Sequence, residues 1–322
     1  MREKKNVSFL FFFFLFILLF LIITFIYFKK KEENFQVYIP NKNSKLILND
    51  YPCGFFCIFN KLLHYLVLYP NTKEIQYKIF SNLNNHKPFI GYGVELLSQI
   101  FEVYKEENTI IEEIHDISGD NFTITMPTNK KAYNFYNQYR FRLDPYYYAF
   151  KKYIILKPHL QTKLNYMTDE LHKDCHQVIG IFVRSNALAN EQPNDKMPSR
   201  DDYLKAINSI DTKTKKTKYF LRIDNEEDLD FYKSKYSPNY ITNIKRSKNN
   251  KGDALHFNRY EYLTREDLED TYLEIALLST CQILIHCVSN MATSSLMMNK
   301  DQLSICVSSP SFVKYRVCTD II

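Results

Sequence analysis

The chain has 322 residues, of which 45% are hydrophobic and 24% are charged, and its net charge is +6. This length suits one long or two ordinary domains, and the globular composition excludes intrinsically disordered and fibrous classes. The chain has 6 glycines and neither a G-x-G-x-x-G nor a G-x-x-x-x-G-K-[ST] motif, which argues against P-loop NTPases and ordinary dinucleotide oxidoreductases. The mild positive charge does not indicate nucleic acid as a partner.

The first predicted element is an uncharged apolar run over residues 7–28. At a rise of about 1.5 Å per residue, a helix of this length spans a hydrocarbon core of roughly 30 Å. A cleaved signal peptide has a shorter apolar region and a small-residue cleavage site, whereas this run ends in Tyr27-Phe28-Lys29. We therefore expect a short tail over residues 1–6, an uncleaved transmembrane signal anchor and a polar stem over residues 29–50. Basic residues flank the run on both sides, so the positive-inside rule does not select its orientation.

Residues 51–175 are expected to form a helix-rich half. Apolar residues at helical spacing predict helices over residues 55–69 and 94–105 and two more between residues 133 and 171, divided at Lys157-Pro158. Short apolar runs at residues 75–80 and 122–126 are typical of strands.

Residues 176–322 alternate strand and helix signals. Alternating units whose strands are almost continuously apolar predict an α/β fold with a parallel sheet covered on both faces. Ser199 is the expected N-cap of the first helix of this half. The predicted strands cover residues 177–184, 218–224, 240–243, 282–287 and 302–307, and the helices cover residues 199–210, 226–236, 265–278 and 289–298.

The seven cysteines show no paired C-x-x-C spacing and are too sparse for a disulfide scaffold. One or two lumenal disulfides stay open, for example from Cys53 and Cys57 to distant partners. Cys287 and Cys306 lie in predicted apolar strands and Cys281 directly precedes one of them, so buried thiols are expected at all three positions. Asn121-Phe122-Thr123 is a glycosylation sequon, to be used if that side of the membrane is lumenal. The basic residues between 245 and 251 alternate with Asn and Ser and are expected to form a solvated loop.

The candidate site lies where the predicted strands of the second half end. Ligands bind at the carboxyl ends of parallel strands, and Arg184, Asp224 and the pair Ser289-Asn290 occupy these positions. A guanidinium suits a diphosphate, a carboxylate accepts hydrogen bonds from a base or ribose, and a helix N-terminus attracts a phosphate. Taken singly, each residue also has an ordinary explanation: a solvated Arg, a capping Asp and a common N-cap.

Three stretches of this half resemble the GT-B-fold fucosyltransferases that include the α1,6-fucosyltransferases and protein O-fucosyltransferases. IGIFVRSN, from residue 179, is similar to the family's G-h-H-h-R strand, in which h is apolar. YFLRIDNEED, from residue 219, resembles its strand ending in A-T-D-D. The third stretch consists of ALHFNRY, from residue 254, and DTYLEIALLSTCQILIHCVSN, from residue 270. It is similar to the family's L-H-x-R-Y segment, acidic helix, L-S-x-x-D strand and Ser-rich turn. GFFCIFN, from residue 54, resembles the loop that opens the N-terminal domain.

The resemblance implies roles for individual residues. Arg184 takes the place of the Arg that contacts the donor diphosphate, Asp224 that of the guanine or ribose contact, and Ser289 and Asn290 lie under the phosphates. His256 would hydrogen-bond the donor or keep a structural role. Glu191 is the candidate base for the acceptor hydroxyl. Glu274 is expected to support the site from its helix.

The sequence also departs from the family pattern. Phe182 stands where the family has a His, the Asp beyond the Arg is replaced around Asn186-Ala187, and Arg222-Ile223 replaces the A-T dipeptide. These departures support an alternative function, that of a catalytically inactive membrane-anchored protein that binds a nucleotide sugar or a glycan.

The resemblance thus implies two Rossmann-like lobes, an acceptor lobe over residues 51–175 and a nucleotide-sugar lobe over residues 176–322. The expected activity is inverting, metal-independent transfer of fucose from GDP-fucose to a glycan or protein, with no cofactor. No D-x-D motif follows an apolar strand, and Arg and a helix dipole are expected to neutralise the leaving diphosphate. The expected location is the Golgi or endoplasmic reticulum membrane, as a single-pass type II protein whose residues 7–28 contact the lipid bilayer.

Overall fold

The computed structural model describes residues 42–49, 55–78, 97–117, 144–184, 198–210, 216–244, 246, 265–287 and 289–307. Among these residues no helix combines the length and apolarity needed to cross a bilayer. The predicted anchor (residues 7–28), the strand at residues 122–126 and the sequon at Asn121 lie outside the described residues.

Strands β1 (Ser44–Asn49), β2 (Thr72–Lys78) and β3 (Glu113–Asp116) form a parallel sheet in the order β2-β1-β3. The central strand β1 buries Leu46 and Leu48. Residues 29–50 were expected to be a polar stem, and for β1 this expectation is wrong, because its alternating apolar side chains join the core.

Helices α2 (Phe55–Leu68), α5 (Asp144–Tyr153) and α6 (Pro158–His172) follow the predicted pattern. Helix α2 ends before Pro70, and α6 begins at Pro158, a residue favoured in the first turn. Within the expected helix over residues 94–105, the described part is helical at residues 97–100 only. From Phe101 the chain is extended, because its backbone bridges to Leu156 and, at Lys105, to β2.

The second sheet contains five parallel strands in the order β6-β5-β4-β7-β8. Its central strand β4 (Gln177–Val183) is buried along its whole length, as an apolar strand covered on both faces should be. The other strands are β5 (Thr217–Ile223), β6 (Asn239–Tyr240), β7 (Ile283–His286) and β8 (Leu303–Cys306).

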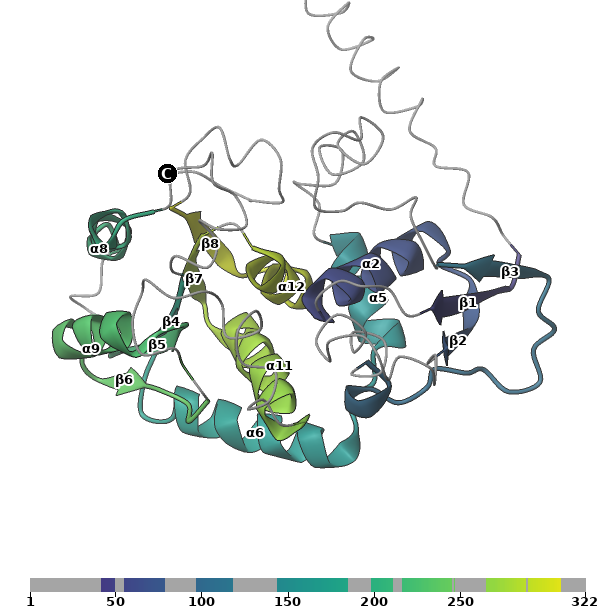
Figure 1. Ribbon diagram of the computed structural model, residues 1–322, viewed down its shortest axis with the longest axis horizontal. Helices are drawn as coiled ribbons and strands as arrows, with labels where there is room; N and C mark the ends of the chain where they lie inside the picture. The colour runs from purple at the N-terminus through teal and green to yellow at the C-terminus, as the bar shows by residue number, and fades with distance from the viewer. Residues whose placement is uncertain are drawn as a thin grey trace, which may run out of the picture. The chain divides into compact units, whose positions relative to one another are not determined.

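Helices cover both faces of this sheet: α8 (Arg200–Asn208) and α9 (Glu226–Lys235) lie on one side, and α6, α11 (Arg265–Thr280) and α12 (Asn290–Met298) lie on the other (Figure 1). Ser199 caps α8 through a capping box with Asp202, as predicted. The chain is therefore an α/β protein with parallel sheets.

Gly180 lets helix α11 approach the centre of the sheet. A Cβ atom at this position would lie 2.8 Å from Leu278 Cδ2 and 3.2 Å from Cys281 Sγ. Cys281, Cys287 and Cys306 are buried, as the sequence predicts.

Helix α12 packs against α2 and α5. The buried amide of Asn60, on α2, donates to the carbonyl of Asn290 at 3.0 Å, and its oxygen accepts from Ser294 Oγ at 2.6 Å. Asn60 belongs to a helix and not to a loop, in contrast to the resemblance noted for residues 54–60. It anchors the first turn of α12.

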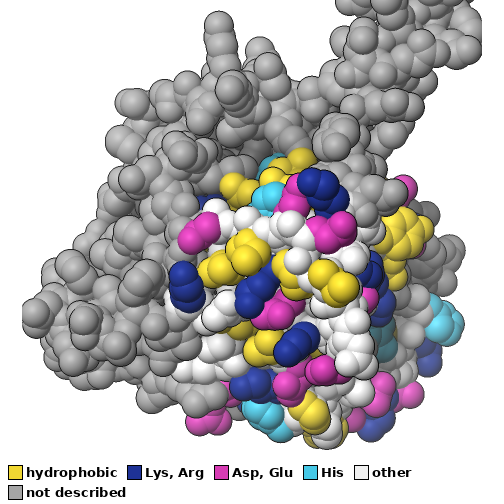
Figure 2. All heavy atoms as spheres, turned by 90° about the vertical axis from the view of Figure 1, so that its right-hand side faces the viewer, with side chains coloured by type: hydrophobic (Ala, Val, Ile, Leu, Met, Phe, Trp, Pro, Cys, Tyr) yellow, Lys and Arg dark blue, Asp and Glu magenta, His cyan; other side chains and the backbone are white. Residues whose placement is uncertain are grey.

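Around the first sheet, cations and anions alternate on the surface shown in Figure 2. Lys45 lies 2.5 Å from Glu74, Lys73 lies 2.7 Å from Glu106 and Lys42 lies 2.8 Å from Glu113. Because these charges are paired locally, this face does not present a field of one sign.

Candidate functional site

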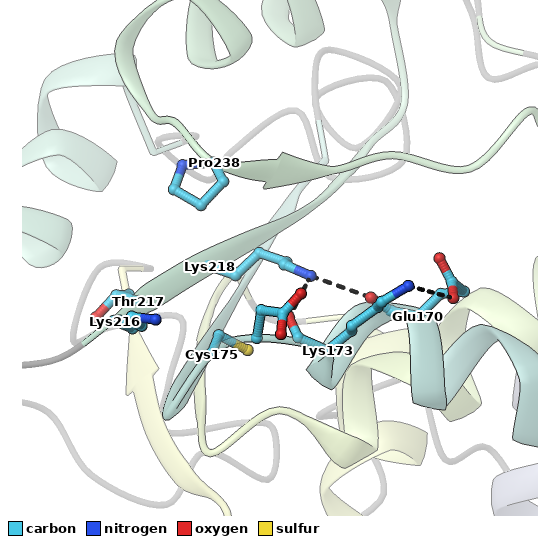
Figure 3. Close-up of a pocket in the computed structure, with 8 residues that line it drawn as sticks. Glu170, Lys173, Cys175, Lys216, Thr217, Lys218 and Pro238 are labelled. Atoms are coloured by element: carbon cyan, nitrogen blue, oxygen red, sulfur yellow. Dashed lines mark hydrogen bonds and ion pairs between the residues drawn. The ribbon is translucent and has the colours of Figure 1, made fainter.

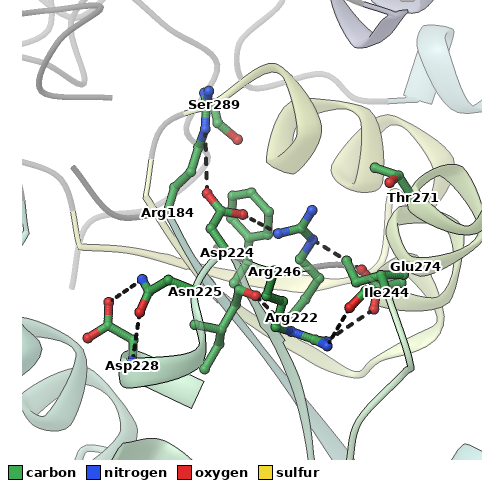
Figure 4. A network of polar contacts seen from close by, with 12 residues as sticks. Arg184, Arg222, Asp224, Asn225, Asp228, Ile244, Arg246, Thr271, Glu274 and Ser289 are labelled. Carbon is green, nitrogen blue, oxygen red and sulfur yellow. Dashed lines mark hydrogen bonds and ion pairs between the residues drawn. The ribbon is translucent and has the colours of Figure 1, made fainter. Parts of the chain in front are cut away.

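Arg184 and Asp224 lie together at the carboxyl edge of the second sheet. Strand β4 pairs with β5 through Val183 and Ile223, so the residues that follow both strands leave the sheet at the same level. Arg184 Nε lies 3.9 Å from Asp224 Oδ2, and the two side chains are 13% and 23% exposed (Figure 4). The structure thus brings the predicted guanidinium and carboxylate into one ion pair.

Ser289 lies at the same edge, because β7 pairs with β4 on the side opposite β5. Its Oγ accepts from the backbone N–H of Ala292 at 3.1 Å, which makes Ser289 the N-cap of α12. Ser289 is buried, and Figure 4 shows it beyond the guanidinium of Arg184. The side chain of Ser289 therefore caps the helix. The backbone N–H groups in the first turn of α12 are the donors that can bind an anion.

Arg222 is a third charged group at this edge, and no motif in the sequence indicates a role for it. Side chains two residues apart lie on the same face of a strand, and Arg222 Nη1 contacts Asp224 Oδ1. Its guanidinium also lies 5.6 Å from the ring centroid of Phe182, which is fully buried. Asp224 is consequently placed between two guanidinium groups.

Glu274, on α11, is completely buried and lies between two arginines. Its Oε2 lies 3.3 Å from Arg222 Nε, and its Oε1 lies 3.6 Å from Arg246 Nη2. Burial raises the pKa of Glu274 to about 7, against the opposite effect of the two guanidinium groups. Glu274 thus contacts the site through Arg222.

The side chain of Arg246 is buried as well, which corrects the expectation of a solvated basic loop at this residue. Its side chain is 6% exposed. Burial lowers the pKa of Arg246 from its ordinary value, while Glu274 raises it.

The sequence holds a signal for the pair of Arg222 and Glu274. Each of these residues interrupts an apolar stretch, Arg222 in a strand and Glu274 in a helix. This pattern indicates a buried ion pair, because such charges are rarely buried alone.

Other predicted residues fall outside the described part of the chain. Glu191, His256 and Ala187 belong to this group, and their assigned roles remain predictions.

Cys287, beside the site, is buried, and burial raises the pKa of its thiol to about 11. It is therefore not a thiolate nucleophile at neutral pH. Within the described ranges, no three His, Cys, Asp or Glu residues are grouped as they would be around a metal ion.

A separate hollow of about 600 Å³ lies at the opposite end of the sheet (Figure 3). Lys218 lines it and donates to the carbonyls of Glu170 and Lys173 at 3.0 and 3.1 Å. Because Lys218 follows the start of β5 and Asp224 follows its end, this hollow is not part of the candidate site.

Comparison with known proteins gives a distant similarity. No family model matches the sequence, and no curated protein matches it. NodZ α-1,6-fucosyltransferase soaked with GDP-fucose is similar at a TM-score of 0.45 and 14% identity, over 80% of this chain and 93% of that chain. An Arabidopsis thaliana FUT1 mutant in complex with GDP is similar at a TM-score of 0.37 and 11% identity, over 84% and 72%.

The fucosyltransferase NodZ from Bradyrhizobium gives a TM-score of 0.35 at 14% identity, over 64% of this chain and 56% of that chain. The present chain spans 55% of NodZ co-crystallised with GDP. Similarity at this level does not assign the chain to a family.

Proposed function

We propose that this chain is a glycosyltransferase that binds a nucleoside-diphosphate sugar at the carboxyl edge of the five-stranded sheet. The observation that carries the proposal is the convergence of Arg184, Asp224 and the first turn of α12 on that edge. A guanidinium and a helix N-terminus bind the phosphates of such a donor, and a carboxylate accepts hydrogen bonds from its ribose or base.

The proposed reaction is inverting transfer of fucose from GDP-fucose to a hydroxyl of a glycan or protein. Negative charge develops on the leaving GDP, and Arg184 and the α12 N-terminus stabilise it without a metal ion. The acceptor hydroxyl loses its proton to a base, for which we propose Glu191. The GT-B assignment and the choice of GDP-fucose rest on the sequence resemblance of residues 179–186, 219–228 and 254–290.

We further propose that residues 7–28 anchor the chain in the Golgi or endoplasmic reticulum membrane, with the enzyme in the lumen. The length of this apolar run and its lack of charged residues support the proposal. In microsomes, the large region should resist added protease until detergent is present. Digestion without detergent would contradict the lumenal orientation.

A binding protein without catalysis is the second candidate, and Phe182 favours it. Phe182 is fully buried beside Arg222, so it supplies neither the proton nor the hydrogen bond of the His in the family pattern. Such a protein would bind GDP-fucose and leave it intact.

Release of GDP from GDP-fucose by the detergent-solubilised full chain separates the two functions. An enzyme releases GDP slowly even without acceptor, and Arg184→Ala should lower the rate about 100- to 1,000-fold. Lys218→Met, at the opposite end of β5, should keep the wild-type rate. Binding of GDP-fucose without release would favour the second candidate, and equal rates for wild type and Arg184→Ala would refute the role of Arg184.

A further inference from the structure

Arg246 makes three backbone contacts near the candidate site. Its Nε donates to the carbonyl of Ile223 at 3.1 Å, and its Nη1 donates to the carbonyls of Thr242 and Ile244 at 2.9 and 3.1 Å. Ile223 is the last residue of β5, directly before Asp224. One guanidinium therefore fixes the end of β5 to the segment that follows β6.

Arg246 also contacts the carboxylate that competes with Asp224 for Arg222. Arg222 Nη1 contacts Asp224 while its Nε lies 3.3 Å from Glu274, and Glu274 in turn lies 3.6 Å from Arg246 Nη2. The charges alternate in sign along the chain of contacts from Arg246 through Glu274, Arg222 and Asp224 to Arg184 (Figure 4). Each member is thereby held by a neighbour of opposite charge.

We propose that Arg246 is a positioning residue for the donor site, which fixes Asp224 against Arg184 through the carbonyl of Ile223 and through Glu274. This inference rests on the proposed function. Loss of Arg246 removes its hydrogen bond to the carbonyl of Ile223 and, among the described residues, one of the two counter-charges of Glu274. Both changes act on Asp224, because Ile223 precedes it and Arg222 is shared between it and Glu274.

Calorimetric titration of the detergent-solubilised full chain with GDP at pH 8 tests the inference. Arg246→Gln should raise the Kd for GDP about tenfold, as expected when charged hydrogen-bonding groups are displaced. Arg246→Lys keeps a cation and should lie between Gln and wild type. Lys218→Met is the matched control, since it removes a cation that donates to backbone carbonyls at the other end of β5. Its Kd should equal that of wild type.

A double-mutant cycle separates positioning from general destabilisation. If Arg246 acts through Asp224, Arg246→Gln should change the Kd less than twofold in an Asp224→Asn background. A purely structural role would give the same loss in both backgrounds and would overturn the inference, as would an unchanged Kd for Arg246→Gln. If Arg246→Gln does not fold, Arg246→Lys is judged in the same cycle by the same criteria.

The wild-type titration keeps the two proposals apart. Wild-type protein that does not bind GDP contradicts the proposed function and, with it, the role of Arg246. Wild-type protein that binds GDP while both Arg246 variants bind equally well contradicts only the role of Arg246.

Discussion

Arg222 and Asp224 are two residues apart at the end of β5, and the guanidinium of Arg222 contacts the carboxylate of Asp224. The same guanidinium contacts Glu274 on α11. The partly exposed carboxylate of Asp224 is thus joined to a buried ion network, so substitutions in the network should alter both stability and ligand binding.

Arg222→Met should destabilise the fold, because Asp224 and the fully buried Glu274 both lose a counter-charge. Removing one partner of a buried ion pair costs about 3–5 kcal/mol in the free energy of unfolding. Urea denaturation at pH 8 measures the change. Lys163→Met is the matched control: Lys163 pairs with Asp270, and the two side chains are 44% and 28% exposed, so about 1 kcal/mol or less is expected. Equal losses for both variants would contradict the network's contribution.

The pH dependence of stability should report on Glu274. Its pKa in the folded protein is raised from 4.5 to about 7, chiefly by burial. A raised carboxyl pKa favours the folded protein fully below pH 4.5, and this contribution is lost as pH rises through about 7. Between pH 5 and 8 the wild type should therefore lose more stability than Glu274→Gln, as measured by urea denaturation.

Glu266→Gln, at an exposed position of the same helix, should follow the wild-type pH dependence. Parallel curves for wild type and Glu274→Gln would show that Glu274 does not titrate in this range.

Gly180→Ala should destabilise the contact between β4 and α11. The added methyl group would lie 2.8 Å from Leu278 Cδ2 and 3.2 Å from Cys281 Sγ. Overpacking of this kind costs about 1–3 kcal/mol. Cys281→Ala creates space, so the double variant should be less unstable than the sum of the single changes predicts. Strict additivity in thermal or urea denaturation would contradict the close approach.

Asn60→Ala should loosen α12 from α2. Asn60 is 1% exposed and bonds both the carbonyl of Asn290 and the hydroxyl of Ser294. Leaving these groups without their partner lowers the free energy of unfolding by about 1–3 kcal/mol. Asn165→Ala removes an exposed bond from Gln161 and should cost under about 0.5 kcal/mol. If Asn60→Ala lowered the free energy of unfolding as little as Asn165→Ala does, the contact of Asn60 with α12 would not stabilise the fold.

The sequence predicted the second sheet well, for identifiable reasons. The stretch that became β4 is continuously apolar, and Ser199 and Asp202 form the capping box that starts α8. β1 was missed because the short Leu46-Ile47-Leu48 run follows a polar segment. The change from helix to extended backbone at Phe101 was not predicted. The residues that pair with this extended segment, Glu74 and Leu156, are distant in the sequence.

The candidate site was predictable in part. Arg184 and Asp224 come directly after apolar strands, and parallel strands bring their ends together. Arg246 lies in a locally basic and polar segment, so only tertiary contacts show that it is buried. Its partners Ile223 and Glu274 lie more than twenty positions away on either side, a separation for which the sequence gives no periodic signal.

Calorimetric titration of the full chain with GDP, for wild type and for Arg184→Ala, tests whether the carboxyl edge of the five-stranded sheet binds a nucleoside diphosphate. A single diphosphate site at Arg184, Asp224 and the α12 N-terminus predicts that wild type binds and that Arg184→Ala binds about 100-fold more weakly, a loss of roughly 3 kcal/mol. The same affinity in both proteins would show that Arg184 does not contact the diphosphate.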